Sequence, residues 1–209
     1  MADEELQPIK GMSDLGPPDI ERWQALESTA RDVFRCYGFS EVRTPMLEKI
    51  AVFTHSLGDN TDVVQKEMYT LTSRDGKEQY ALRPEGTAGV MRYVGSLGQD
   101  GQNARLYYIG PMFRGERPQK GRRRQFHQIG VEAIGAPCPA ADAEAIALQV
   151  HLLRAWGLKD FQIHVNTLGV PEDRVAVQAG LRAALAPHAE QLCEDCRRRM
   201  ETNVLRVLD

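Results

Sequence analysis

The chain has 209 residues, of which 42% are hydrophobic and 26% charged, and its formal net charge is −3 at pH 7. These values exclude disordered, collagen-like and fibrous chains, and the slight acidity excludes a protein that binds nucleic acid by bulk positive charge. The sequence has no apolar run long enough to span a membrane, no apolar signal segment at its acidic start, and too few cysteines for a disulfide framework. We therefore expect a cytoplasmic protein with no membrane partner.

The first predicted element is an amphipathic helix. It begins at Pro18 and Asp19, because proline and an acidic residue favour the first turn of a helix. Apolar residues then recur at helical spacing as far as Gly38, a residue typical of helix C-termini. Residues 39–44 follow as a short strand that ends at Pro45, because proline cannot donate to a strand ladder.

The middle of the chain alternates between strands and turns. Residues 68–72 and 79–83 flank Asp75-Gly76, a pair that is typical of a β-hairpin turn. A helix is predicted from Thr87, near its N-cap, to about Leu97.

The second half of the chain begins with a long antiparallel hairpin. Its two strands are residues 105–114 and 125–134, joined by a basic loop. A helix is predicted at 142–156 and a half-buried strand at 161–166, where apolar and polar residues alternate. From residue 171 onward the pattern predicts two helices broken near a proline. Because the strands lie in hairpins, the fold class predicted from the residues alone is α+β with an antiparallel sheet.

The loop of the long hairpin carries a concentrated positive charge. Between residues 114 and 124 it has six cations and one acid, which are Arg114, Arg117, Lys120, Arg122, Arg123 and Arg124 against Glu116. Such a contrast in an acidic chain indicates an anionic partner, and the arginine fork suits phosphate. A solvated loop tip charged for solubility is the alternative.

The strand after this loop has two different faces. Phe126, Gln128, Gly130 and Glu132 share one face, whereas the other is mostly apolar and is expected to pack into the core. An aromatic ring can stack on a base, a glycine leaves room, and the two polar side chains can accept hydrogen bonds. Arg114 reaches the same face from the opposite strand. This face therefore predicts a site for a nucleotide and a small cationic or amphoteric ligand.

A second cluster lies at a predicted strand-to-helix turn, where an acid and a hydroxyl flank a glycine. Glu85 and Thr87 are candidates to bind a substrate ammonium group. The alternative is a helix cap with an acidic residue in its first turn, which is a common device.

These segments resemble the histidyl type of class II aminoacyl-tRNA synthetases. Motif 2 of that family is similar to residues 112–135, MFRGERPQKGRRRQFHQIGVEAIG, and its histidine-binding turn to residues 82–92, LRPEGTAGVMR. The first helix and the strand ending at Pro45 resemble motif 1, the dimer-forming element, and residues 9–17 resemble the family's N-terminus. The resemblance runs from about residue 9 to residue 209.

The resemblance implies a class II synthetase-like antiparallel sheet flanked by helices. It implies a ligase that activates histidine with ATP and Mg²⁺ and passes the histidyl group to tRNA(His), acting as a homodimer. Residues 1–170 would form the catalytic core with motifs 1 and 2, and residues 171–209 the incomplete start of a helical insertion. Motif 3, the segment with the family's second catalytic arginine and the anticodon-binding domain have no counterpart in the sequence, so the chain would hold part of the active site.

Residue roles also follow from the resemblance. Arg114 would clamp the α-phosphate and stabilise the transition state, and Glu116 would hold the adenine amino group with Phe126 stacked on the ring. Arg122 would reach the distal phosphates. The histidine would be held by Glu85, Thr87, Gln128 and Glu132.

Two further interpretations concern the same residues and the cysteines. The synthetase-like regulatory subunit of ATP phosphoribosyltransferase resembles the same fold without charging tRNA, but it typically lacks an intact ATP loop, which this sequence keeps. Cys193 and Cys196 form a C-x-x-C pair, but zinc needs four ligands and no second pair exists, so we expect no metal site.

Overall fold

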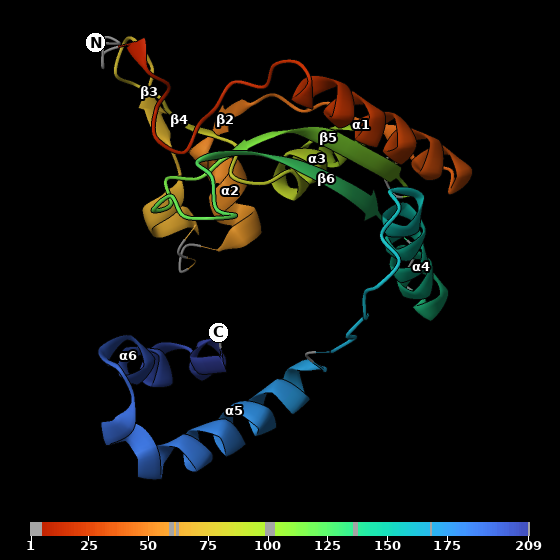
Figure 1. Ribbon diagram of the computed structural model, residues 1–209. Coiled ribbons are helices and arrows are strands. Elements are labelled where there is room, and N and C mark those ends of the chain that lie inside the picture. The colour runs from red at the N-terminus through yellow and green to blue at the C-terminus, as the bar shows by residue number, and fades with distance from the viewer. Residues whose placement is uncertain are drawn as a thin grey trace. The chain divides into compact units, whose positions relative to one another are not determined.

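The computed structural model describes residues 6–58, 61, 63–98, 103–135, 138–167 and 169–208. They form two compact units that divide between residues 159 and 160. Figure 1 shows the first unit in red to teal and the second in blue. Among the described residues no helix is long and apolar enough to cross a membrane.

The first sheet of the larger unit contains the predicted long hairpin. Its order is β1-β5-β6, with β1 (Ser40–Glu41), β5 (Arg105–Phe113) and β6 (Gln125–Ala133). β5 and β6 are antiparallel, as predicted, and pair from Arg105 with Ala133 to Phe113 with Gln125. β1 is shorter than the predicted strand at residues 39–44 and runs parallel to β5. It is short because the chain then leaves the sheet, and the Thr44 carbonyl accepts a hydrogen bond from Arg83 instead.

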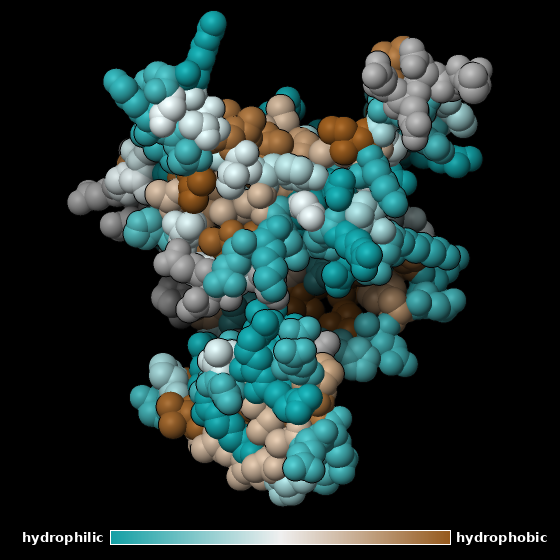
Figure 2. Space-filling model, turned by 90° about the vertical axis from the view of Figure 1, so that its left-hand side faces the viewer, coloured by the Kyte–Doolittle hydropathy of each residue, from teal (hydrophilic) through white to brown (hydrophobic). Residues whose placement is uncertain are grey.

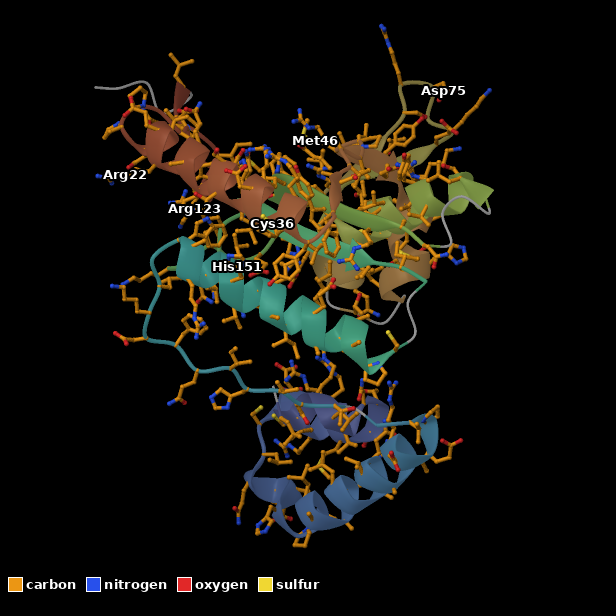
Figure 3. The ribbon with its side chains drawn as sticks, turned by 90° about the vertical axis from the view of Figure 1, so that its right-hand side faces the viewer. Arg22, Cys36, Met46, Asp75, Arg123 and His151 are labelled. Atoms are coloured by element: carbon orange, nitrogen blue, oxygen red, sulfur yellow. The ribbon has the colours of Figure 1, made fainter. Side chains whose placement is uncertain are left out.

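Two helices cover one face of this sheet. They are α1 (Asp19–Cys36) and α4 (Pro139–Ala155), which begin and end close to the predicted positions. Figure 3 shows them side by side, with Cys36 on α1 and His151 on α4. The core between them and the sheet includes Phe34 and Leu152, and Ile129 and Val131 of β6 pack against it. The apolar face predicted for this strand is therefore confirmed.

The second sheet contains the predicted shorter hairpin. Its order is β2-β4-β3, with β2 (Leu47–Lys49), β3 (Thr70–Thr72) and β4 (Gln79–Leu82). The turn has Gly76 at a φ of 76°, which is the left-handed region that favours glycine. The remaining elements are the predicted helix α3 (Thr87–Ser96), and α2 (Ile50–Leu57) and η2 (Val63–Glu67), which the sequence did not reveal. Phe53 of α2 is fully buried against Ala81 and Ala88.

The smaller unit is helical, as predicted. It contains α5 (Pro171–Leu185), η4 (Ala186–Gln191), α6 (Glu194–Thr202) and η5 (Val204–Leu208). Pro187 lies in η4, at the break between the two main helices. The strand predicted at residues 161–166 is wrong, because this segment is irregular and mostly exposed. An alternating pattern forms a strand only where another strand is available to pair with it, and none of the described residues supplies one here.

Candidate active site

The predicted polar face of β6 lies opposite the turn that precedes α3. Across the hairpin, Phe126 pairs with Met112, Gln128 with Gly110 and Gly130 with Tyr108. The small residues of these pairs leave space above the sheet. The turn at residues 83–87 occupies part of that space, because Arg83 lies over Gly110 and Gly86 contacts Gln128.

Glu85 caps helix α3. Its carboxylate accepts hydrogen bonds from the backbone N–H groups of Thr87, at 2.5 Å, and Ala88, at 2.8 Å. The side chain is only 8% exposed. The helix-cap interpretation of this acid is thus realised in the structure. Because each carboxylate oxygen has two acceptor positions, the cap still leaves Glu85 able to accept from a ligand.

Two hydrogen bonds join this turn to β6. The Gly86 backbone N–H donates to the Gln128 Oε1 at 3.1 Å, and the Thr87 hydroxyl donates to the Glu132 Oε1 at 2.7 Å. Glu85, Thr87, Gln128 and Glu132 therefore form one connected group, although they lie up to 47 positions apart in the sequence. All four present oxygen atoms, so the group favours a ligand rich in N–H donors.

The electrostatics of the group also favour a cation. Burial raises the pKa of Glu132; the Thr87 hydrogen bond opposes this shift and the neighbouring Glu85 adds to it. The charged form of Glu132 is thus disfavoured by burial and by repulsion from Glu85. A positively charged ligand offsets both effects and therefore stabilises the carboxylate.

Tyr108 is a member of this site that the sequence analysis missed. It is 5% exposed, and a Cβ atom placed on either Gly86 or Gly130 would overlap its ring. The space that Gly130 was expected to leave is thus filled from within the protein. Strand parity could have found Tyr108, because it lies two residues before Gly110 and four before Met112 on the same face of β5.

Arg83 is a second residue that was missed. It is 8% exposed, and its guanidinium lies over Gly110, where a Cβ atom would be 2.5 Å from a terminal nitrogen. It donates to the backbone carbonyls of Thr44 and Pro111, each at 2.9 Å. Burial lowers its pKa. The buried Arg83 guanidinium is thus hydrogen-bonded to backbone carbonyls, and these bonds connect the turn to the segments that contain Thr44 and Pro111.

The residues predicted to bind a nucleotide meet at the start of the basic loop. The Arg114 Nε donates to the Pro84 carbonyl at 2.9 Å, and its guanidinium lies 5.1 Å from the centre of the Phe126 ring. Glu116 is 3.9 Å from Arg114 and 3.4 Å from Arg122. The Arg114 guanidinium is therefore held between the turn and the aromatic ring.

Backbone contacts from distant segments anchor the loop. The Gly115 N–H donates to the Glu67 carbonyl at 2.6 Å, and the Arg124 N–H donates to the Gly11 carbonyl at 2.8 Å. Gly11 has a φ of 90°, and a Cβ atom there would be 3.0 Å from the Arg124 side chain. Arg123 donates to the Ser13 hydroxyl at 2.8 Å. The N-terminal segment therefore helps to shape the loop.

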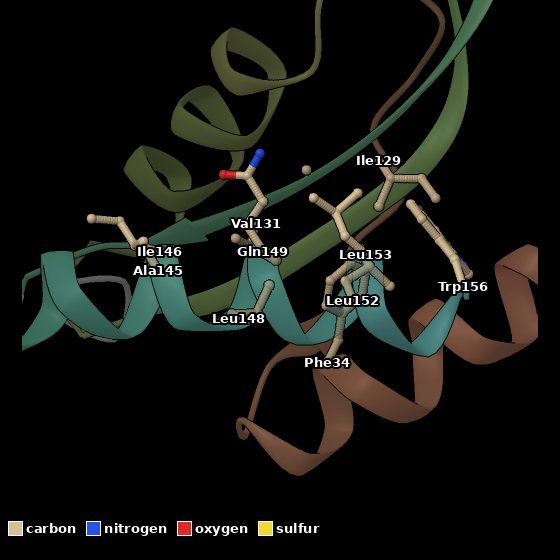
Figure 4. A pocket seen from close by; sticks show the side chains of 11 residues that line it. Phe34, Ile129, Val131, Ala145, Ile146, Leu148, Gln149, Leu152, Leu153 and Trp156 are labelled. Carbon is tan, nitrogen blue, oxygen red and sulfur yellow. The ribbon is translucent and has the colours of Figure 1, made fainter. Parts of the chain in front are cut away.

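Two apolar hollows lie away from this group. One of about 400 Å³ lies between α4 and β6, where Leu148, Leu152 and Trp156 line it (Figure 4). Another of about 520 Å³ is lined by residues of α2 and α3, including His55 and Met91. Neither is lined by any of the eight predicted site residues. Within the described ranges, no group of three or more histidine, cysteine or acidic residues is arranged to hold a metal ion.

Comparison with known proteins identifies relatives of the whole chain. The family model described as "Histidyl-tRNA synthetase" matches residues 11–201. The histidine–tRNA ligase of Geobacter sulfurreducens is 50% identical over 203 residues, which cover 96% of this chain and 49% of that protein. The chain thus spans about half the length of the curated relatives it matches.

Solved structures agree with this match. Apo histidyl-tRNA synthetase from S. aureus is 33% identical with a TM-score of 0.73, and the match covers 97% of this chain and 48% of that one. A Bacillus halodurans protein titled as an ATP phosphoribosyltransferase regulatory subunit/histidyl-tRNA synthetase has a TM-score of 0.70 at 21% identity, covering 96% of this chain and 55% of that one. The second match supports the fold alone. The class II synthetase-like α+β fold expected from the sequence is thereby confirmed.

Proposed function

The chain belongs to the histidyl-tRNA synthetase family, and on that premise we propose that it is the N-terminal part of a cytoplasmic enzyme that joins histidine to tRNA(His). Residues 1–170 supply motifs 1 and 2 of its catalytic core, and residues 171–209 begin a helical insertion. The observation that carries the proposal is the connected acceptor group beside Arg114 and Phe126. It offers an amino-acid subsite and a nucleotide subsite next to each other.

Histidine binds at the acceptor group. Glu85 and Thr87, at the N-terminus of α3, accept hydrogen bonds from the substrate ammonium together with Gln128. Glu132 accepts from a further N–H group of the substrate. This assignment follows the charge of the site, because a bound cation stabilises the buried carboxylate of Glu85 and the partly buried carboxylate of Glu132.

ATP binds on the side of the basic loop. Phe126 stacks on the adenine ring, and Glu116 accepts from the adenine amino group. Arg122, which is 64% exposed, turns from Glu116 toward the distal phosphates. Parting this ion pair costs little, because exposed pairs contribute only about 0–1 kcal/mol.

Adenylation is accelerated by charge stabilisation. The histidine carboxylate attacks the α-phosphorus and pyrophosphate leaves, so negative charge grows on the α-phosphate oxygens. Arg114 is held by Pro84 and Phe126 before the reaction begins and meets that charge without reorganising.

Mg²⁺ enters with ATP. The described residues hold no cluster of three potential metal ligands, and Glu116 is paired with Arg114 and Arg122. A magnesium ion bound with ATP would keep several waters and would be held mainly by the phosphates. It would screen the phosphate charge while Arg114 holds the α-phosphate.

Histidine-dependent ATP–pyrophosphate exchange by the full-length protein tests the function. We expect exchange with histidine and none when histidine is replaced by other amino acids. A full-length protein that binds histidine without any exchange would favour the regulatory subunit of ATP phosphoribosyltransferase. That protein class shares the fold and needs no adenylation.

The proposed enzyme is a homodimer, and an exposed apolar surface supports this. Leu47 pairs with Leu82, and Leu71 pairs with Tyr80, so these four side chains lie on one face of the second sheet. Lys49, which also pairs with Tyr80, lies at the border of this face and forms an ion pair with Glu78. Leu47 and Leu71 are each 43% exposed. Figure 2 looks onto the side where β3 and β4 lie in Figure 1, and shows hydrophobic residues gathered among hydrophilic ones. Exposed apolar patches of this kind mark interfaces between proteins.

A protein of residues 1–209 is therefore expected to sediment as a dimer at micromolar concentration, at about twice its chain mass of 23.4 kDa. Leu71→Glu places a charge in the apolar face and should shift the equilibrium toward the monomer. Leu158→Glu, at an exposed leucine after α4, is the matched control and should leave the dimer intact. A parent protein that sediments only as a monomer would contradict the assignment.

A further inference from the structure

Arg83 lies at the start of the turn that carries the proposed amino-acid subsite. Its backbone N–H donates to the Met46 carbonyl at 2.9 Å, and its carbonyl accepts from the Phe113 N–H at 3.0 Å. Its guanidinium donates from Nε to the Pro111 carbonyl, and from Nη1 to the carbonyl and the hydroxyl of Thr44, at 2.9, 2.9 and 3.2 Å. Both the backbone and the side chain of Arg83 therefore attach the start of the turn to β5 and to the segment before β2.

The guanidinium of Arg83 fits a space that neighbouring residues keep open. It lies over Gly110, where a Cβ atom would be 2.5 Å from Nη2, and among the described residues both atoms within 4 Å of that Cβ position belong to Arg83. Its partner Thr44 is confined as well, because a Cβ atom on Gly89 of α3 would be 2.9 Å from the Thr44 hydroxyl oxygen. Since Arg83 is 8% exposed and its acceptors are held in this way, its guanidinium has one defined position.

The residues that follow Arg83 place groups at both proposed subsites. The Pro84 carbonyl accepts from the Arg114 Nε at 2.9 Å, so the position of Pro84 decides where the Arg114 guanidinium lies. Glu85 comes next and caps α3 through hydrogen bonds from two backbone N–H groups. A shift of the chain at Arg83 would therefore move the proposed α-phosphate donor and the proposed ammonium acceptor together.

We propose that Arg83 is a positioning residue for adenylation, because its buried hydrogen bonds fix the turn on which Arg114 and Glu85 depend. The inference rests on the proposed function and deepens it. The side-chain hydrogen bonds of Arg83 go to the protein, so Arg83 acts through its neighbours and not on the substrates. Preorganised groups stabilise a transition state only where its charge develops, and a displacement of about 1 Å can reduce the rate about 10²-fold.

The alternative is that Arg83 contributes to stability alone, and a second arginine of β5 allows the two to be distinguished. Arg105 lies at the other end of the strand, opposite Ala133 in the hairpin register. It donates to the Tyr37 carbonyl at 2.7 Å, forms an ion pair with Glu144, and its side chain is 35% exposed. Removal of Arg105 should therefore cost stability without moving the turn.

Arg83→Met in the full-length enzyme tests the proposal, with Arg105→Met as the matched control. Methionine keeps an apolar chain and removes the hydrogen bonds. We expect Arg83→Met to lower the kcat of histidine-dependent pyrophosphate exchange on the order of 10²-fold and to raise the KM for histidine, because Arg114 and Glu85 both shift. The KM for ATP should stay within a few-fold, because the proposed adenine contacts come from the hairpin. Arg105→Met should leave all three values near those of the parent, even where thermal melting shows an equal loss of stability.

A double-mutant cycle separates positioning from a general loss of structure. In an Arg114→Ala background the turn has no α-phosphate donor left to position. Adding Arg83→Met should then lower kcat little further, whereas the KM for histidine should still rise. Independent losses of kcat in the double variant, an unchanged kcat in Arg83→Met, or equal effects of the two methionine variants would overturn the proposal.

Gly110→Ala decides the question if Arg83→Met does not fold. The added methyl group meets the Arg83 guanidinium and displaces it without removing a charge or an acceptor. We expect kcat to fall and the KM for histidine to rise, both by less than in Arg83→Met. Values equal to those of the parent would contradict the positioning role. A parent enzyme without histidine-dependent exchange would instead refute the proposed function.

Discussion

Replacing Arg114 by alanine in the full-length enzyme should reduce histidine-dependent adenylation by roughly 10²–10³-fold, about 2.7–4 kcal/mol, as for loss of one preorganised transition-state donor. The structure supplies the reason for so large an effect. The guanidinium is held by the Pro84 carbonyl and the face of Phe126, so its charge is in place before the reaction. Alanine removes that charge together with both contacts that hold it. Pyrophosphate exchange and single-turnover adenylate formation measure the loss.

Two controls distinguish loss of the Arg114 side chain from unfolding and from a general loss of positive charge. Arg114→Ala removes one partly buried hydrogen bond, so the free energy of unfolding should fall by only about 1 kcal/mol. Lys120→Ala removes an exposed cation from the same loop and should leave adenylation within a few-fold of the parent. Comparable losses in both variants would show that the loop acts through its total charge. An Arg114→Ala enzyme with near-normal exchange would refute the assignment to the α-phosphate.

A protein of residues 1–209 alone should fold but bind histidine and ATP no more tightly than about millimolar, roughly −4 kcal/mol. Its adenylation should be orders of magnitude slower than that of the full-length protein. The proposed ammonium subsite is drawn from residues 85–132 and is within this chain, but the relatives are about twice as long. Binding energy from the remaining groups is needed to align the reacting atoms.

Calorimetric titration of residues 1–209 with histidine and with ATP measures the two affinities. A single-turnover adenylate assay measures the rate of adenylation. Circular dichroism and thermal melting of the same sample show whether it has folded, which separates a weak site from an unfolded one. Micromolar histidine affinity combined with near-normal adenylation would mean that residues 1–209 contain most of the catalytic machinery. The division of the active site proposed above would then be wrong.

Local signals were sufficient for most of the architecture. The helix α1 between Asp19 and Gly38, the Asp75-Gly76 hairpin and the alternating faces of β6 are confirmed, because each depends on residues close together in the chain. The strand at residues 161–166 failed for the opposite reason. Its alternation is a local property, whereas a strand also needs a partner, and tertiary structure decides whether one is present.

The candidate site shows the same division. The sequence by itself determined which residues are candidates for the chemistry: the acids, amide and hydroxyl from Glu85 to Glu132, and the arginines of the basic loop. Only the tertiary structure decided that Glu85 caps α3, that Thr87 donates to Glu132, and that Tyr108 fills the slot between two glycines. Strand parity states which face a side chain occupies, but not which distant segment lies above that face. That choice is made when the turn and the hairpin pack together, because close packing leaves room over Gly86 and Gly130 for a single ring.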